Sequence, residues 1–302
     1  LFTELERSKV RNAFSQYMSP VMVEKLAQSS ESLKLGGERK EMTFLFSDIR
    51  GFTSISEKYK GDPEALTDLI NNLLTVLSNE ILNNQGTIDK YMGDCIMAFW
   101  NAPSEDTEHR EKSIDAAFAM SKALEQLNKD LNRVDEDKLS VGIGINTGEC
   151  IVGNMGSDKR FDYTVLGDAV NLASRLEGQS GNYGMQIILG EGSIQGLSED
   201  KYSVCELDLI AVKGKSEPVT IYTVFNKEDS AIVDENFLLE HQDFLMNYRN
   251  QNWLKAKDHI DKYRFSKTEF TLYYTLFLER IDELSEQTLP NDWSGVFIAK
   301  TK

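Results

Sequence analysis

The feature that most constrains the fold is a short apolar run that ends in a carboxylate and continues into a glycine-containing turn. Residues 42–46 (Met-Thr-Phe-Leu-Phe) lie between charged segments, a pattern that predicts a buried strand. Asp48 would then stand at the rim of a sheet, where its hard oxygen atoms can reach a divalent cation. The turn Ile49–Thr53, in which Gly51 can adopt a positive φ, can direct backbone N–H groups at a phosphate. By itself, the segment also fits a strand end without function or the phosphoacceptor aspartate of a receiver domain.

A second stretch, Thr87–Trp100, predicts two short strands joined by a turn at Gly93 and Asp94. If this hairpin pairs with the first strand, Asp94 and Asp48 can converge on one cation. Two carboxylates and the phosphates of a substrate are what a magnesium site usually offers. The two stretches together therefore favour a site for a metal ion and a polyphosphate.

A third stretch, Phe161–Glu177, contains a predicted helix with an apolar side. Asn171 and Arg175 are one helical turn apart and therefore share a face. An amide and a guanidinium placed in this way suit a developing negative charge. The alternative is a plain surface ion pair of Arg175 with a nearby carboxylate.

Four motifs follow one another in the chain: FSDIRGFT from Phe46, DKYMGD from Asp89, GDAVNLASR from Gly167 and VKGK from Val212. In order and spacing this series resembles the catalytic domain of class III nucleotidyl cyclases, over about residues 41–225. One such motif would be weak evidence for the family, but the four together are specific for it. The resemblance implies an α+β fold: a ferredoxin-like core with a mainly antiparallel sheet and helices on one face.

The resemblance also implies two Mg²⁺ or Mn²⁺ ions per site and a set of site residues. Lys215 is close enough in spacing to be an alternative to Lys213 as the lysine that contacts the terminal phosphates. The implied residues are Asp48, Ile49 and Asp94 for the metals; Ile49, Gly51, Phe52, Thr53 and Lys213 for the phosphates; and Asn171 and Arg175 for the ribose and the transition state.

Lys90 and Thr164 match the family positions that read the purine. An ammonium can donate to N1 of adenine and a hydroxyl can accept from its exocyclic amine, whereas guanine presents the opposite polarity. We therefore expect ATP as substrate and an adenylyl cyclase that forms 3′,5′-cyclic AMP. A guanylyl cyclase and a catalytically silent nucleotide-binding regulatory domain are the alternatives. Threonine at this position resembles cyclases that bicarbonate stimulates, which makes a bicarbonate response a further hypothesis.

In the family the purine and ribose groups come from the opposite subunit, so this chain, which holds both sets, is expected to form a homodimer with two equivalent sites. The expected reaction is in-line attack of the ribose 3′-hydroxyl on the α-phosphorus with loss of pyrophosphate. No residue stands out as a protein general base.

Composition limits the partners. The formal net charge of −16 argues against nonspecific binding to nucleic acid or to an anionic membrane, since both need clustered cations. The three cysteines are odd in number and widely spaced, which favours a reducing compartment without a disulfide framework. The sequence has no apolar run of transmembrane length, so we expect a cytoplasmic domain.

The pattern predicts three segments. Residues 1–40 resemble the helical connector that joins sensor regions to bacterial cyclase domains, and a preceding sensor could anchor the intact protein in the inner membrane. Residues 41–226 would be the catalytic domain, with a helix that begins at Asp62-Pro63 and separate strands at 139–145 and 149–152. Residues 236–302 show only helical pattern, resemble part of a tetratricopeptide unit and should dock on the catalytic domain or its dimer mate.

Overall fold

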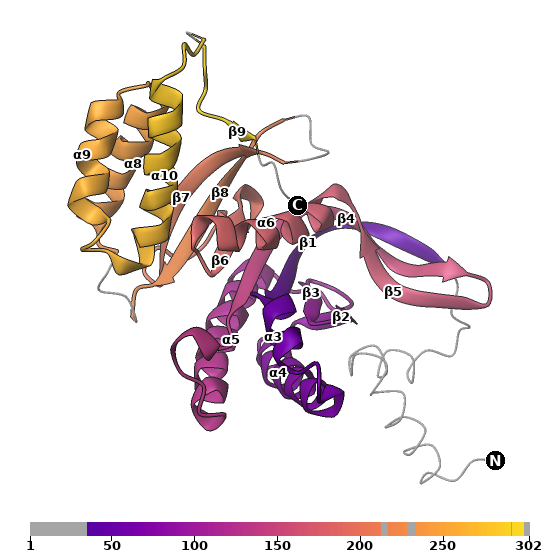
Figure 1. Ribbon diagram of the computed structural model, residues 1–302. Coiled ribbons are helices and arrows are strands. Elements are labelled where there is room, and N and C mark those ends of the chain that lie inside the picture. Colours follow the sequence, from indigo (N-terminus) through magenta and orange to yellow (C-terminus); the bar gives the residue numbers. More distant parts are fainter. Residues whose placement is uncertain (1–34, 213–216, 229–232, 291, 299–302) are drawn as a thin grey trace, which may run out of the picture.

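The computed structural model describes residues 35–212, 217–228, 233–290 and 292–298 (Figure 1). Most of the expected connector, together with Lys213 and Lys215, lies outside these ranges. The strands are β1 (Gly36–Ile49), β2 (Thr87–Met92), β3 (Cys95–Trp100), β4 (Val141–Ser157), β5 (Arg160–Leu166), β6 (Ile187–Gly190), β7 (Tyr202–Ala211), β8 (Val219–Asn226) and β9 (Phe297–Ile298). The α-helices are α3 (Phe52–Lys58), α4 (Pro63–Asn83), α5 (His109–Asp130), α6 (Asp168–Tyr183), α7 (Glu191–Ile194), α8 (Glu235–Arg249), α9 (Trp253–Tyr263) and α10 (Thr271–Ser285), and short 3₁₀ turns are η1 (Asp135–Asp137) and η2 (Thr268–Phe270).

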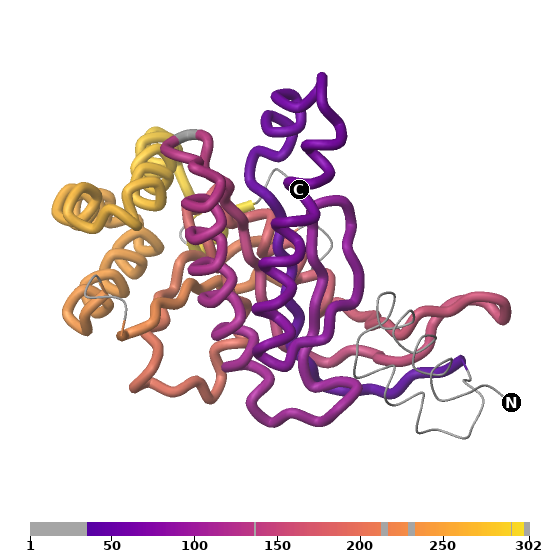
Figure 2. The backbone as a smooth tube through the Cα atoms, turned by 90° about the horizontal axis from the view of Figure 1, so that it is seen from below, coloured from indigo at the N-terminus to yellow at the C-terminus, as the bar shows by residue number. Residues whose placement is uncertain are grey.

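The strands form one nine-stranded sheet in the order β2-β3-β1-β4-β6-β8-β7-β9, with β5 paired to β4. The pairs β4–β6 and β7–β9 are parallel and the others are antiparallel. The predicted α+β class with a mainly antiparallel sheet is therefore confirmed. The strand β1 begins at Gly36, inside the segment that was expected to be connector. The β4–β5 hairpin and the first part of β1, which pairs with β4 as far as Gly36 opposite Asn154, extend together away from the other described elements (Figures 1 and 2).

Helices cover both faces of the sheet, so the expected placement on one face is wrong. Leu45 of β1 packs into a core with α4 and α5, whereas Phe44 packs into a second core with the start of α6, as strand alternation requires. The helix α6 lies so close to β4 that a Cβ atom on Gly144 would stand 2.2 Å from the backbone nitrogen of Glu177. Glycine at this position therefore allows α6 to pack on the face opposite α4 and α5.

The strand β4 is continuous through the Thr147-Gly148 step, where two separate strands were predicted. Both residues pair with β1, Thr147 opposite Thr43 and Gly148 opposite Met42. The Thr147 hydroxyl also shares hydrogen bonds with those of Thr43 (2.7 Å) and Ser193 (3.0 Å). Pairing with a long neighbouring strand thus overrides the local turn signal.

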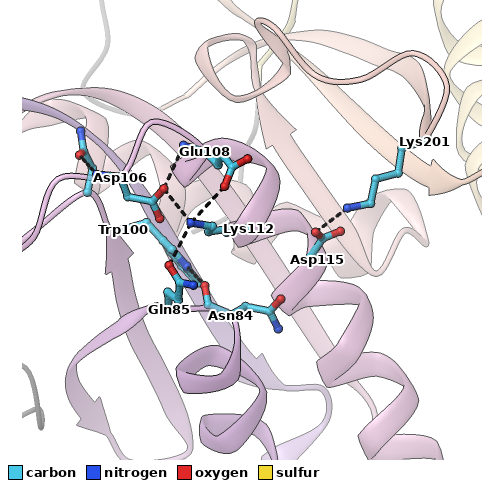
Figure 3. Close-up of polar contacts among 9 residues, drawn as sticks. Asn84, Gln85, Trp100, Asp106, Glu108, Lys112, Asp115 and Lys201 are labelled. Carbon is cyan, nitrogen blue, oxygen red and sulfur yellow. Dashed lines mark hydrogen bonds and ion pairs between the residues drawn. The ribbon is translucent and has the colours of Figure 1, made fainter.

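The hairpin β2–β3 and the helices α4 and α5 are held together at one end by polar contacts (Figure 3). Lys112 of α5 donates to Gln85 in the turn after α4 and to Asp106, both at 2.9 Å. The indole N–H of Trp100 donates to the carbonyl of Asn84 at 2.8 Å.

At the start of α4, the side chain of Asp62 accepts a hydrogen bond from the amide of Ala65 at 3.0 Å. Asp62 therefore caps the helix that was predicted to begin at Asp62-Pro63.

The C-terminal helices α8 and α10 pack against β7 in the same chain, and α9 packs on α8 and α10 (Figure 1). Their buried aromatic residues share one hydrophobic cluster with Leu176 and Tyr183 of α6 and with Leu207 of β7. Trp293 and Phe297 pack at the edge of this cluster. These helices therefore pack on α6 and β7 of the same chain.

Candidate active site

The carboxylates of Asp48 and Asp94 meet at one end of the sheet. The strand β1 pairs with β3 up to Ser47 opposite Ile96, which places the end of β1 beside the Gly93-Asp94 turn. The amide N–H of Ile49 donates to Asp48 Oδ1 at 3.0 Å and to Asp94 Oδ2 at 3.3 Å. The structure thus brings together the two acidic residues that the sequence proposed as metal ligands.

The electrostatics of this pair suit a cation. Partial burial and the neighbouring Asp94 carboxylate raise the pKa of Asp48 to about 6, because both disfavour the ionised form of Asp48. A divalent cation would relieve this repulsion, and Mg²⁺ is often held by one or two carboxylates and substrate phosphates. Within the described ranges, no three or more His, Cys, Asp or Glu side chains gather in a metal-binding arrangement. A pair of carboxylates fits an ion that also takes ligands from a substrate.

Glu177 is a further acidic group near this pair, and the sequence analysis did not propose it. Burial raises its pKa to about 7, the charges of Asp48 and Asp94 add to the effect, and the Arg50 guanidinium opposes it. A helical signal was available, because Glu177 follows Ala173 by one turn and so shares its sheet-facing side. Its nearness to Asp48, by contrast, depends on the close approach of α6 to β4.

The turn after β1 differs in part from the expected phosphate cradle. Gly51 has the left-handed conformation (φ 68°) and α3 begins directly after it. Phe52 and Thr53 occupy the first turn of α3, where amide groups have no acceptor within the helix. The amide of Ile49 already donates to the two carboxylates, and that of Arg50 donates to the carbonyl of Ser140 at 2.9 Å. The first turn of α3 is therefore the part of this segment that could receive a phosphate.

Lys90 and Thr164 lie beside the same carboxylate, that of Asp89. The Thr164 hydroxyl donates to Asp89 Oδ2 at 2.9 Å, and the ammonium of Lys90 stands 3.5 Å from that oxygen. The side chain of Asp89 is 1% exposed and that of Lys90 is 44% exposed. The two residues proposed to read the purine are thus brought together by a residue that the sequence analysis did not single out.

Asn171 and Arg175 both lie on α6, as predicted. Asn171 is exposed and Arg175 is half-buried, whereas the residues that follow each of them, Leu172 and Leu176, are buried. The amide and the guanidinium therefore point away from the apolar side of the helix. Lys213, proposed for the terminal phosphates, lies outside the described residues.

None of the helices in the described ranges combines the length and the apolar character needed to cross a bilayer.

Known proteins are similar to this chain in sequence and fold. The family model of the adenylate and guanylate cyclase catalytic domain matches residues 37–226. An adenylate cyclase from Anabaena cylindrica is 35% identical over 224 residues, which is 72% of this chain and 43% of that protein. The chain thus spans less than half the length of this relative.

Two solved structures are also similar to part of this chain. The adenylyl cyclase CyaB from P. aeruginosa is 41% identical with a TM-score of 0.57, and the match covers 63% of this chain and 96% of that one. The guanylyl cyclase Cya2 is 34% identical with a TM-score of 0.55, over 63% of this chain and 94% of that one. With the motifs, the sheet topology and the carboxylate pair in place, the chain belongs to the family of adenylate and guanylate cyclase catalytic domains.

Proposed function

We propose that the protein is an adenylyl cyclase that converts ATP to 3′,5′-cyclic AMP and pyrophosphate. The observation that carries this choice is the position of Lys90 and Thr164 beside one carboxylate. An ammonium and a hydroxyl next to each other offer a donor to N1 and an acceptor to the exocyclic amine of adenine. Guanine carries a donor at N1 and an acceptor at O6, so the same pair would oppose it.

The phosphate end of ATP would lie against the carboxylate pair. Asp48 and Asp94, with the backbone of Ile49 between them, would hold two Mg²⁺ or Mn²⁺ ions, which supply Lewis-acid polarisation of the attacking and bridging oxygens. The first turn of α3 and Lys213 would bind the phosphates. Asn171 would orient the ribose, and Arg175 would take up negative charge that develops in the in-line transition state.

A homodimer would complete the site, with the carboxylate pair from one chain and the purine and ribose groups from the other. Support comes from apolar side chains that remain open to solvent near the base-reading residues. Ile151 and Leu166, a cross-strand pair on β4 and β5, are 40% and 61% exposed, and Tyr91 beside Lys90 is 49% exposed. Exposed apolar surface of this kind is typical of an interface.

Guanylyl cyclase is the second candidate, because the guanylyl cyclase Cya2 is 34% identical. A catalytically silent domain is disfavoured, since the candidate metal-binding and transition-state residues Asp48, Asp94, Asn171 and Arg175 are all present.

The test is a comparison of kcat/KM for ATP and GTP, with Mg²⁺ and with Mn²⁺, over a range of protein concentrations. We expect a preference for ATP and a specific activity that rises with protein concentration as dimers form. A preference for GTP would assign the chain to the second candidate. Equal specific activity at all protein concentrations, together with a monomer in analytical sedimentation, would contradict the proposal that the active site is shared between two chains.

A further inference from the structure

Asp89 occupies an irregular position in β2. The pairing of β2 with β3 shifts register between Ile88, opposite Ala98, and Lys90, opposite Met97, so that Asp89 is the extra residue of a β-bulge. In a regular strand, neighbouring side chains point to opposite faces. The bulge re-aims one of them and lets the carboxylate of Asp89 and the ammonium of Lys90 come within 3.5 Å.

The carboxylate of Asp89 is buried and only partly satisfied. Its Oδ2 accepts from the Thr164 hydroxyl, whereas its Oδ1 has no hydrogen-bond partner among the described residues. Burial raises the pKa of Asp89, and the Thr164 hydrogen bond and the Lys90 charge oppose this shift. A buried acceptor without a partner costs stability. The position is therefore poorly explained by a purely structural role.

We propose that Asp89 is a positioning residue for base selection, which fixes the hydrogen-bond polarity of Thr164. This inference rests on the proposed role of Lys90 and Thr164 in reading the purine. A hydroxyl has one hydrogen and two acceptor lone pairs, and an ionised carboxylate can only accept. Once the Thr164 hydrogen is directed at Asp89, only its lone pairs remain for a base. They can accept from the exocyclic amine of adenine and repel O6 of guanine.

Without the carboxylate, the Thr164 hydroxyl could rotate and donate to guanine. A site built around a hydrogen bond rejects a substrate that leaves one of its polar groups without a partner. The polarity of one hydroxyl therefore changes the selectivity between ATP and GTP more than the overall affinity for nucleotides. Asp89 also holds the Lys90 ammonium near Thr164. The bulge thus presents a donor and an acceptor side by side, each with a fixed role.

The test compares Asp89→Leu with wild type in the full chain. Leucine has similar volume and no acceptor, and we expect the ATP-to-GTP ratio of kcat/KM to fall about tenfold, the value of one ordinary hydrogen bond. Asp89→Asn keeps one acceptor oxygen for Thr164 and should restore most of the ratio. The matched control is Asp162→Leu, which removes an exposed carboxylate whose charge also acts on Asp89; it should leave the ratio unchanged.

A double-mutant cycle locates the effect. In a Thr164→Val background, Asp89→Leu should change the ratio by less than it does in wild type, because the hydroxyl it orients is gone and only its contact with Lys90 remains. The thermal midpoint of Asp89→Leu should equal or exceed that of wild type. A lower midpoint with an unchanged ratio would make Asp89 a structural residue and overturn the inference.

A binding measurement distinguishes failure of this inference from failure of the proposed function. Displacement of a fluorescent ATP analogue by ATP and by GTP gives the ratio of affinities without turnover. The proposed function fails if wild type forms no cyclic AMP or prefers GTP. The Asp89 inference fails if wild type and Asp89→Leu have the same ratio of affinities, whatever the turnover.

Discussion

The guanidinium of Arg280 donates to Asp208 at 2.6 Å, and the two side chains are 7% and 1% exposed. Asp208 lies in β7 and Arg280 in α10, so this buried ion pair joins the C-terminal helices to the sheet. The hydroxyl of Tyr183, near the end of α6, donates to the same carboxylate oxygen at 2.6 Å. Three elements that are distant in sequence therefore meet at one buried charge.

Arg280→Met should destabilise the chain by about 3–5 kcal/mol, because Asp208 would keep a buried charge without its partner. Urea unfolding at pH 7 measures this loss. The control is Lys257→Met, which breaks the surface pair Lys257–Asp282 and should cost less than about 1 kcal/mol. Equal losses for the two variants would show that Asp208 finds another partner.

Acid should destabilise the C-terminal helices through His241. Its Nε2–H donates to the carbonyl of Glu206 at 2.7 Å and its Nδ1 accepts from Tyr274 at 2.9 Å, while burial lowers its pKa to about 3. Between pH 6.5 and that value the unfolded chain binds a proton that the native chain does not, so stability falls as the pH falls. His241 lowers the free energy of unfolding by at most about 1.4 kcal/mol for each pH unit of acidification.

Unfolding free energies of wild type and His241→Gln at pH 7, 6 and 5 test this. The variant keeps a donor for Glu206 but loses the titrating group, so its stability should fall less steeply with acid. Parallel curves would exclude His241 as a source of the pH dependence.

Gly144→Ala should destabilise the chain, because the added Cβ would stand 2.2 Å from the Glu177 nitrogen and 2.3 Å from the Ala173 carbonyl oxygen. The helix α6 would have to move, at a cost of about 1–3 kcal/mol. Turnover should fall too, since α6 carries Asn171 and Arg175. Gly181→Ala, in the same helix with nothing within 4 Å, should instead stabilise by about 0.5–1 kcal/mol. Denaturant unfolding of both variants gives the comparison.

Asp48→Asn should abolish turnover and leave the fold at least as stable as wild type. The raised pKa of Asp48, about 6, means that ionisation at neutral pH weakens the native state, because the native chain holds the proton more tightly than the unfolded one. The amide removes this repulsion together with a proposed metal ligand. Thermal midpoints with and without MgCl₂ test both points: Mg²⁺ should raise the midpoint of wild type and of the control Asp68→Asn, and not that of Asp48→Asn.

Local patterns predicted much of the fold. The apolar run before Asp48, the turn at Gly93-Asp94 and the Asp62-Pro63 helix start each depend on residues close in sequence, and each is present. The continuous β4 and the placement of α6 depend on partners far along the chain. Thr147 and Gly148 have the composition of a turn, and only pairing with β1 makes them part of a strand.

The same distinction holds for the candidate site. Asp48 and Asp94 could be paired from sequence, because a strand end and a hairpin turn are local features. Asp89 and Glu177 could not be assigned a role in this way, because their burial follows from a β-bulge and from the close packing of α6 on β4. A carboxylate that neighbours a motif residue looks like a solvent-facing charge until the tertiary contacts are known.

The aromatic cluster beneath α8, α9 and α10 also bears on how the chain can be divided. The matched cyclase region stops at residue 226, yet Leu176, Tyr183 and Leu207 are covered by side chains such as Phe244, Tyr273 and Phe277 from beyond that limit. The region matched by the family model and the packed hydrophobic core therefore have different boundaries. A shortened protein that ends at residue 226 would expose a hydrophobic surface to water beside the helix that carries Asn171 and Arg175. Such a protein would be prone to aggregation.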